Sequence, residues 1–248
     1  MTLVSVICPY YKKKKFIDKS LNSILNQSYN NLEIIIIYDD TDLEDYNFLK
    51  SKYKDNKKIK IFKNEKNVGA GISRNKGIKK SKGEYLAFID SDDIWNDKKI
   101  EKQLKFMINK NIQISHTSYE IVNDKDEIIG RRFAKNFLNY NSLLKSCDIG
   151  LSSAMIKKSI LKDDLFFPNI KTKEDFVLWL KLLKQNYKIF AYKEYLTKWR
   201  KTDNSLSSST LQKLKDGFKV YNYYMNYNFL KSIYLLICLS INFLKKNE

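Results

Sequence analysis

Apolar residues in the first half of the chain follow two alternating patterns. Short runs rich in branched or aromatic residues predict strands at residues 3–8, 32–38, 59–62 and 85–89. Apolar residues at helical spacing, or lysine-rich segments between those runs, predict helices at residues 16–26, 46–54, 72–80 and 97–108. The run LEIIIIY at 32–38 is nearly continuous, as expected for a parallel strand covered on both faces. This order predicts an α/β fold with a parallel, doubly wound, Rossmann-like sheet flanked by helices through about residue 115.

The pattern changes after residue 114. Short strands are expected at 115–122 and 128–132, followed by helices near 141–147 and 176–185. No repeat and no Pro- or Gly-rich linker marks a boundary, so this half is expected to complete one fold with the first.

The last segment, residues 211–248, predicts an amphipathic helical tail. It ends in FLKSIYLLICLSINFLKK, an apolar run interrupted by Lys231 and Asn242 and shorter than the roughly 20 residues of a membrane-spanning helix. An aromatic, basic helix of this kind can lie on an anionic membrane surface. It can equally pack on the domain or on another subunit as an oligomer contact, and the sequence leaves these alternatives open.

Composition adds a strong positive charge. The 248 residues include 46 Lys and Arg against 28 Asp and Glu, a formal net charge of +18. Because 43% of the residues are hydrophobic, the chain can bury a core and carry this charge on its surface, which predicts an anionic partner. Nucleic acid is not the expected partner, because the aromatic residues lie mostly in apolar runs rather than among exposed basic residues.

The rare residue types, histidine and cysteine, and the first residues of the chain restrict the possible chemistry and the expected cellular compartment. The single histidine, His116, excludes a zinc site built from paired histidines and is expected to be structural or on the surface. Cys8, Cys147 and Cys238 lack any CxxC spacing, which favours reduced thiols. The first residues lack a signal-peptide pattern, so a cytoplasmic protein is expected.

Acidic residues gather directly after two of the predicted buried strands. Asp39, Asp40 and Asp42 follow the strand at 32–38, and Asp90-Ser91-Asp92 follows the strand at 85–89. Both clusters are expected to face one crevice at the carboxyl edge of the sheet. Carboxylates there suit Mn²⁺ or Mg²⁺ held jointly with substrate phosphates. The alternative is helix capping, which Asp93 or Asp97 could supply.

A glycine-containing segment, NVGAGISRNKGI, lies between these clusters. Gly69 and Gly71 allow the backbone to approach a ligand, and Arg74 can clamp a phosphate. The segment also resembles a dinucleotide-binding fingerprint, but Arg74 stands where the third glycine would be, which disfavours NAD.

Together these residues carry a resemblance to a known family. VSVICPYYKKKKFIDKSLNSILNQSYNNLEIIIIYDD, NVGAGISRNKGI, YLAFIDSDDIW and KEDFVLWLKLL occur in the order found in family 2 inverting glycosyltransferases. The similarity covers about residues 2–205 and is greatest to bacterial enzymes that build lipopolysaccharide, lipooligosaccharide or capsule. It implies a GT-A fold, a nucleotide-sugar donor such as a UDP-sugar, a glycan or glycolipid acceptor and a divalent cation. Together with the C-terminal tail, the expected location is the cytoplasm or, peripherally, the cytoplasmic face of the inner membrane.

The resemblance also implies roles for individual residues. Residues 1–115 would form the nucleotide-sugar-binding half and residues 116–210 the acceptor-binding half. Asp90 and Asp92 match the DXD motif, in which Asp92 would bind the metal and Asp90 would contact metal, ribose or sugar. Glu174-Asp175 matches the acceptor-side ED motif, whose aspartate resembles a catalytic base. The other expected contacts to the nucleotide-sugar are Pro9 and Tyr11 at the base, Asp40 paired with the nucleobase, Gly69, Arg74 and Ser91.

Four features keep other interpretations open. Asp39-Asp40-Thr41-Asp42 replaces the usual DDGS, and KWRKTDNSLS lacks the histidine often found after the arginine, although a late basic loop over the diphosphate is still expected. Glu174-Asp175 could simply be an acidic first turn of a helix. The Lys12–Lys15 run could be a solvated loop or could steer anionic donors. A catalytically inert GT-A-like scaffold, or a membrane-associated accessory subunit, is the alternative to an enzyme.

Overall fold

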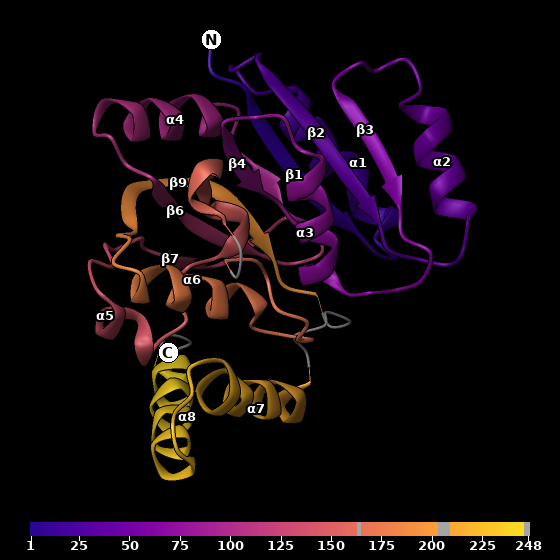
Figure 1. Ribbon diagram of the computed structural model, residues 1–248. Helices are drawn as coiled ribbons and strands as arrows, with labels where there is room; N and C mark the ends of the chain where they lie inside the picture. Colours follow the sequence, from indigo (N-terminus) through magenta and orange to yellow (C-terminus); the bar gives the residue numbers. More distant parts are fainter. Residues whose placement is uncertain (163–164, 203–208, 246–248) are drawn as a thin grey trace.

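The computed structural model describes residues 1–162, 165–202 and 209–245, whose strands form a single curled sheet (Figure 1). Its strand order is β3-β2-β1-β4-β8-β6-β9-β5, with β7 paired to β6. The elements of the first half are β1 (Val4–Tyr10), α1 (Lys14–Leu25), β2 (Leu32–Tyr38), α2 (Glu44–Lys52), β3 (Ile59–Lys63), α3 (Ala70–Lys80), β4 (Tyr85–Phe88), β5 (Ile94–Trp95) and α4 (Lys99–Asn109). Strands β1 to β4 pair in parallel, as the β-α alternation predicts.

The second half contributes the antiparallel part of the sheet. Its elements are β6 (Ile114–Val122), β7 (Ile128–Arg132), α5 (Tyr140–Leu144), the 3₁₀ helix η1 (Leu151–Ser153), β8 (Met155–Lys157), the 3₁₀ helix η2 (Lys158–Ile160), α6 (Glu174–Lys184) and β9 (Phe190–Arg200). Strand β8 joins the halves, because it pairs antiparallel with both β4 and β6. The sheet therefore continues without a break through the boundary expected near residue 115.

Two strands of this half are absent from the sequence expectations. The three-residue β8 is too short to show a period. Strand β9 (FAYKEYLTKWR) places Lys193, Glu194 and Lys198 among its apolar residues, so no clean alternation marks it. It pairs in parallel with β6, with register shifts at Thr117 and Ser118, and antiparallel with β5. Long-range pairing to β6 stabilises a strand that its local pattern does not predict.

Apolar residues cover both faces of the sheet. On one face α1, α2 and α4 pack over alternate residues of β1, β2 and β4, including Val6, Ile34 and Ala87. On the other face α3, α5 and α6 pack over the intervening residues, including Ile7 and Phe88. Helix α6 is apolar on nearly all sides, with Trp179 fully buried, because the sheet covers one side and the C-terminal segment covers the other.

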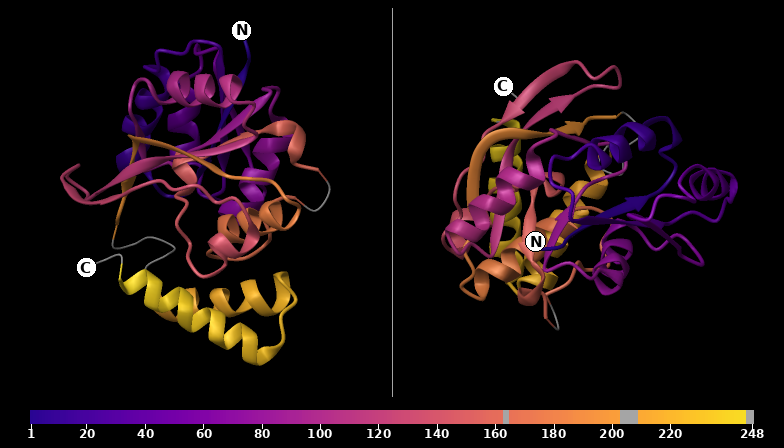
Figure 2. Two further views of the ribbon diagram at one scale, coloured as in Figure 1. Left: turned by 90° about the vertical axis from the view of Figure 1, so that its left-hand side faces the viewer. Right: turned by 90° about the horizontal axis from the view of Figure 1, so that it is seen from above.

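The tail forms two helices instead of the single helix suggested by its apolar run. Helix α7 (Thr210–Lys219) continues into a π-helical turn, η3 (Val220–Tyr224), and α8 (Phe229–Leu244) returns beside it below α6, on the far side of the molecule from the N-terminus (Figures 1 and 2). Leu235 and Leu239 of α8 join the core. The expectation that the tail packs on the domain is therefore correct for the face of α8 that carries Leu235 and Leu239.

A second stripe of α8 faces outward. Leu230, Ile233, Ile237, Ile241 and Leu244 are all exposed, at spacings of three or four residues that place them on one side of the helix. Within residues 1–162, 165–202 and 209–245, helices fall short of the length and apolar character needed to cross a membrane.

Candidate active site

A buried arginine joins three elements at the carboxyl edge of the sheet. Arg74 lies on α3 and is 3% exposed. One of its terminal nitrogens lies 2.6 Å from Asp90 Oδ1 at the end of β4, and the other donates to Glu174 Oε1 at the start of α6. These carboxylates hold the pKa of Arg74 well above its usual range despite burial. Arg74 thus brings the expected donor-side and acceptor-side acids into one site.

The position of Arg74 also explains a nearby glycine. A Cβ on Gly71 would lie 2.9 Å from the carbonyl oxygen of Pro168 and 3.2 Å from Glu174 Cγ. Gly71 therefore permits α3 to approach the segment before α6, which is the approach that the Arg74–Glu174 contact requires. The glycine here serves packing between two protein segments.

Asp39 and Asp40 have different surroundings although they are adjacent. Asp39 accepts hydrogen bonds from Asn64 Nδ2 and from the backbone N–H groups of Val68 and Gly69. Its carboxylate thus fills the N-terminal end of α3, where a dinucleotide fold would bind pyrophosphate. Gly69, with φ of 87°, adopts the left-handed backbone that this contact needs.

Asp40, in contrast to Asp39, accepts hydrogen bonds only from the turn that it begins, among the bonds that the structure describes. Its Oδ1 accepts from the N–H groups of Thr41 and Asp42, at 2.8 and 3.3 Å. The replacement of DDGS by Asp39-Asp40-Thr41-Asp42 therefore still gives a turn capped by Asp40. Of the expected base-pocket residues, Pro9 is buried in β1 beside β2, and Tyr11, just past β1, is 38% exposed. The ring of Tyr10 stacks on Tyr38, behind this turn.

The segment Asp90-Ser91-Asp92-Asp93 is fixed by residues far along the chain. The Asp90 N–H donates to Ser152 Oγ, and the Ser152 hydroxyl donates to Asp93. Asp93 also accepts from the Arg200 N–H at 2.8 Å. Burial, together with Asp92 and Asp90, raises the pKa of Asp93 well above its ordinary value. The capping alternative is wrong, because Asp93 bonds to β9 and η1 while Lys98 occupies the N-cap of α4.

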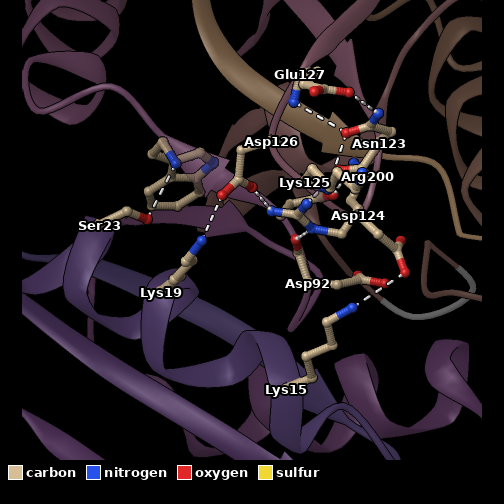
Figure 3. Close-up of polar contacts among 12 residues, drawn as sticks. Lys15, Lys19, Ser23, Asp92, Asn123, Asp124, Lys125, Asp126, Glu127 and Arg200 are labelled. Atoms are coloured by element: carbon tan, nitrogen blue, oxygen red, sulfur yellow. Dashed lines mark hydrogen bonds and ion pairs between the residues drawn. The ribbon is translucent and has the colours of Figure 1, made fainter.

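Arg200 is a structural clamp of the site. It is 3% exposed, and its guanidinium donates to the carbonyl oxygens of Asp92 and Asn123 and to the Asp126 carboxylate. Figure 3 shows this side chain between Asp92 and the turn that links β6 to β7. The remainder of the late basic loop expected over the diphosphate includes residues 203–208, which lie outside the described residues.

Three lysines of the Lys12–Lys15 run, at the start of α1, pair with acids from other segments. Lys13 Nζ lies 2.7 Å from Asp92 Oδ2, and Lys14 pairs with Glu44. Lys15 and the nearby Lys19 face Asp124 and Asp126 of the β6–β7 turn (Figure 3). These contacts show that the run also holds α1 against the β6–β7 turn.

The donor set at Asp92 fits a divalent cation bound together with a ligand's phosphates. Asp92 is partly buried, and burial and Asp90 raise its pKa while Lys13 lowers it, so the carboxylate already depends on an adjacent cation. Asp90 is held by Arg74. The described residues contain no group of three or more acidic, His or Cys ligands, so phosphate and water oxygens would complete the coordination.

Glu174 and Asp175 occupy the first turn of α6 and point to different partners. Glu174 binds Arg74, while Asp175 Oδ1 accepts from the Phe176 N–H at 2.7 Å. Burial first, and then Glu174, raise the pKa of Asp175 to about 7, against the opposing effect of Arg74. The preceding Lys173 has a left-handed backbone, φ of 65°. Asp175 can thus exchange a proton near neutral pH.

Tyr119 of β6 is a site residue that the sequence analysis missed. Its ring lies against Gly150, where a Cβ would be 2.9 Å from Tyr119 Cε1. Burial raises its pKa, and the charges of both Asp175 and Asp93 act in the same direction. Both acidic segments therefore act electrostatically on Tyr119. Ser152 and Tyr119 carry no local motif, whereas Lys13 belongs to the Lys12–Lys15 run; contacts between distant segments bring all three to the site.

His116 is structural, as expected. It is 1% exposed on β6, its Nε2 lies 2.9 Å from the Lys135 carbonyl oxygen, and burial lowers its pKa to about 4. It takes no part in the acidic site.

The fold is the GT-A fold of glycosyltransferases. The structure of S. aureus TarS residues 1–349 in complex with UDP-GlcNAc aligns with 95% of this chain and 70% of that one, at a TM-score of 0.74 and 21% identity. The mannosyltransferase PcManGT of Pyrobaculum calidifontis, in complex with GDP-Man and Mn²⁺, aligns with 96% of this chain and 73% of its own, at a TM-score of 0.69 and 13% identity.

Sequence comparison identifies the family. Residues 5–165 match Glycosyl transferase family 2, and the chain belongs to this family. TuaG of Bacillus subtilis, named as a teichuronic acid biosynthesis glycosyltransferase, is 32% identical over 98% of this chain and 97% of its own length. The Escherichia coli enzyme WfgD, a UDP-Glc:α-D-GlcNAc-diphosphoundecaprenol β-1,3-glucosyltransferase, is 34% identical over 99% of this chain and 95% of its own.

Proposed function

We propose that this protein is an inverting glycosyltransferase that moves a sugar from a nucleotide-sugar donor, a UDP-sugar, to a hydroxyl of a bacterial surface glycan acceptor carried on a lipid. The observation that carries the proposal is the Arg74 bridge, which joins Asp90, after β4, to Glu174, at the start of α6. Relatives of nearly equal length that are named for such reactions support it.

The transfer requires one base and one leaving group. The acceptor hydroxyl gives its proton to the Asp175 carboxylate while its oxygen bonds to the anomeric carbon of the donor sugar. The bond from that carbon to the donor phosphate breaks, and its electron pair leaves with the nucleoside diphosphate. Because attack and departure occur on opposite faces, one displacement inverts the anomeric centre. Glu174 is proposed to position this turn of α6 through Arg74.

The donor side has separate tasks. Asp40, Pro9 and Tyr11 are proposed to receive the base, with Gly69 nearby, and Asp90 and Ser91 to face the ribose or sugar. Asp92 would hold Mn²⁺ or Mg²⁺, with Asp90 beside it. A bound divalent cation supplies electrostatic stabilisation of the charge that grows on the leaving diphosphate.

The tail is proposed to rest peripherally on an anionic, cytoplasmic membrane face. The exposed apolar stripe of α8 supports this, because it is accompanied by lysines that attract anionic lipids. Such a position would bring the site close to a lipid-carried acceptor.

Donor turnover tests the proposal directly. Purified protein is incubated with a panel of UDP-sugars and Mn²⁺, and UDP release is measured. We expect one sugar to give release, and Asp92→Asn to lower it by about a hundredfold or more. Asp97→Asn, an exposed acid five positions along, serves as the matched control and should retain full activity. Absence of both UDP binding and UDP release across the panel would instead favour an inert GT-A-like scaffold or an accessory subunit.

A further inference from the structure

Three lysines from separate segments meet beside the acceptor-side acids. Lys173 directly precedes Glu174-Asp175, Lys201 directly follows β9, and Lys213 lies on α7. A Cβ on Gly217 of α7 would lie 3.7 Å from Lys173 Cε. Because Lys213 and Gly217 are four residues apart, they occupy the same face of α7. Lys173 and Lys213 therefore share the junction between the tail and the catalytic half, and the charge of Lys201, at the end of β9, acts on Lys213 there.

The lysine cluster (Lys173, Lys201 and Lys213) is held in place by the backbone. Thr172 donates two hydrogen bonds, from its N–H and its hydroxyl, to the buried Asp216 of α7. The Lys201 N–H donates to the Val122 carbonyl oxygen at 2.9 Å. The first contacts fix the start of the Lys173 side chain next to α7, and the last one fixes the start of the Lys201 side chain beside the end of β6.

The cluster lacks compensating acids. Among residues 1–162, 165–202 and 209–245, no carboxylate forms an ion pair with any of its three lysines. Asp216 is occupied by Thr172, and Glu174 by Arg74. Burial, and repulsion from Lys173 and Lys201, lower the pKa of Lys213. Like charges gathered at a half-buried junction lower stability, which indicates that an anionic ligand neutralises them.

The surroundings of the cluster indicate which anion fits. On one side lies Asp175, close enough for Lys173 to lower its pKa. On the other side, Lys213 Nζ stands 5.5 Å from the ring centroid of Phe243, in the exposed apolar part of α8. A proton acceptor, a positive cluster and an apolar surface thus follow one another, in the same order as the hydroxyl, phosphate and lipid of a lipid-linked sugar phosphate.

We propose that Lys173, Lys201 and Lys213 bind the phosphate that joins the acceptor sugar to its lipid carrier. This inference rests on the proposed function, because it takes Asp175 to be the base that receives the acceptor's proton. Binding of the phosphate sets the distance between carrier and sugar, so the cluster selects acceptors with a charged link over neutral glycosides.

The test is a binding measurement that needs no turnover. Octyl phosphate, below its micelle concentration, is titrated calorimetrically into full-length protein saturated with metal-free UDP, and neutral octyl glucoside is the ligand control. We expect octyl phosphate to bind and octyl glucoside not to bind. Lys213→Gln and Lys201→Gln should each weaken binding about tenfold, as for loss of a charge-assisted hydrogen bond. Lys215→Gln, an exposed lysine on another face of α7, should leave binding unchanged.

Two outcomes would overturn the inference: equal binding by Lys213→Gln and wild type, or equal binding of octyl phosphate and octyl glucoside. Vesicle flotation distinguishes an acceptor phosphate from a phospholipid headgroup. If Lys213→Gln loses binding to phosphatidylglycerol vesicles but keeps octyl phosphate affinity, the cluster serves the membrane and the inference is wrong. UDP affinity, measured on the same samples, reports separately on the proposed function, since its absence would contradict the donor site and leave the lysine result intact.

Discussion

The donor side and the acceptor side of the site differ in how their charges are compensated. On the donor side each described acid has a protein partner: Asp39 binds N–H groups of the next turn, Asp90 binds Arg74, and Asp92 binds Lys13. On the acceptor side Asp175 has a neighbouring carboxylate, and the lysine cluster has no paired acid within the described residues. A donor that binds here would displace existing ion pairs of the acids, such as that of Asp92 with Lys13. An acceptor phosphate would instead supply the negative charge that the lysine cluster lacks.

This contrast gives the two sides different expected behaviour. A donor phosphate and its cation compete with Lys13 for Asp92, so donor affinity depends on how easily that ion pair opens. The acceptor side gains stability when a ligand binds, because the bound anion ends repulsion among the lysines. Arg74 is the one described side chain that contacts acids of both sides.

Removal of Arg74 should therefore have the largest effect. Arg74→Met leaves Asp90 and Glu174 without their cation in a partly buried site, and we expect the free energy of unfolding to fall by about 3–5 kcal/mol. Urea denaturation monitored by fluorescence measures this. Arg131→Met, which breaks the exposed pair with Glu120, is the control and should cost at most about 1 kcal/mol. Similar losses in both variants would show that Arg74 does not couple the two sides.

Asp175→Asn should impair the acceptor side and leave the donor side unchanged. We expect transfer to fall by about 10²–10⁴-fold, as for loss of a general base, while UDP affinity is retained. In the wild type, transfer should increase as the pH rises through about 7, where Asp175 loses its proton. Steady-state transfer rates and UDP titration measure the two properties. An Asn variant with full transfer activity would remove Asp175 as the base.

Asp175 should also make the free energy of unfolding depend on pH in the direction opposite to that of an ordinary ion-paired acid. Because its pKa is raised from 3.8 to about 7, the folded state binds more protons than the unfolded chain between these values. Its contribution to the free energy of unfolding therefore decreases as pH rises across this window. We expect Asp175→Asn to raise Tm more at pH 8 than at pH 5. The reverse order would contradict the raised pKa.

Lys13→Gln should strengthen metal binding on the donor side. Without the competing ammonium, we expect Mn²⁺ to bind the donor-free protein about fivefold more tightly, which corresponds to about 1 kcal/mol for a partly exposed ion pair. Electron paramagnetic resonance of free Mn²⁺ measures the affinity without any turnover. Lys15→Gln, two positions away and paired with Asp124, should leave it unchanged. Weaker binding in Lys13→Gln would indicate that Lys13 assists the metal site.

The smallest effect is expected in the lysine cluster without ligand. Lys213→Gln should raise the free energy of unfolding by about 0.3 kcal/mol, since a like-charge repulsion is removed. Lys215→Gln on the same helix should not. Paired thermal melts at low ionic strength measure the difference, and 1 M salt should abolish it by screening.

Sequence alone determined the parallel half of the fold and the acids at its edge. Apolar runs such as residues 32–38 and 85–89 predict buried strands, and parallel strands end at one edge, so Asp40 and Asp92 were predictable at the same edge of the sheet, although β1 lies between their strands. Glu174-Asp175 was predictable as a candidate only through the family resemblance, because an acidic first turn has a purely structural explanation too.

Tertiary structure alone decided which charges meet. The sequence suggests Arg74 as a phosphate clamp, but burial between β4 and α6 makes it a bridge between Asp90 and Glu174. Strand β9 is defined by its pairing with β6, and α7 is fixed by the bonds from Thr172 to Asp216. Local periodicity records which face of an element is buried, but it contains no information about contacts between residues a hundred positions apart. Those contacts place Lys13 on Asp92 and gather the lysine cluster beside Asp175.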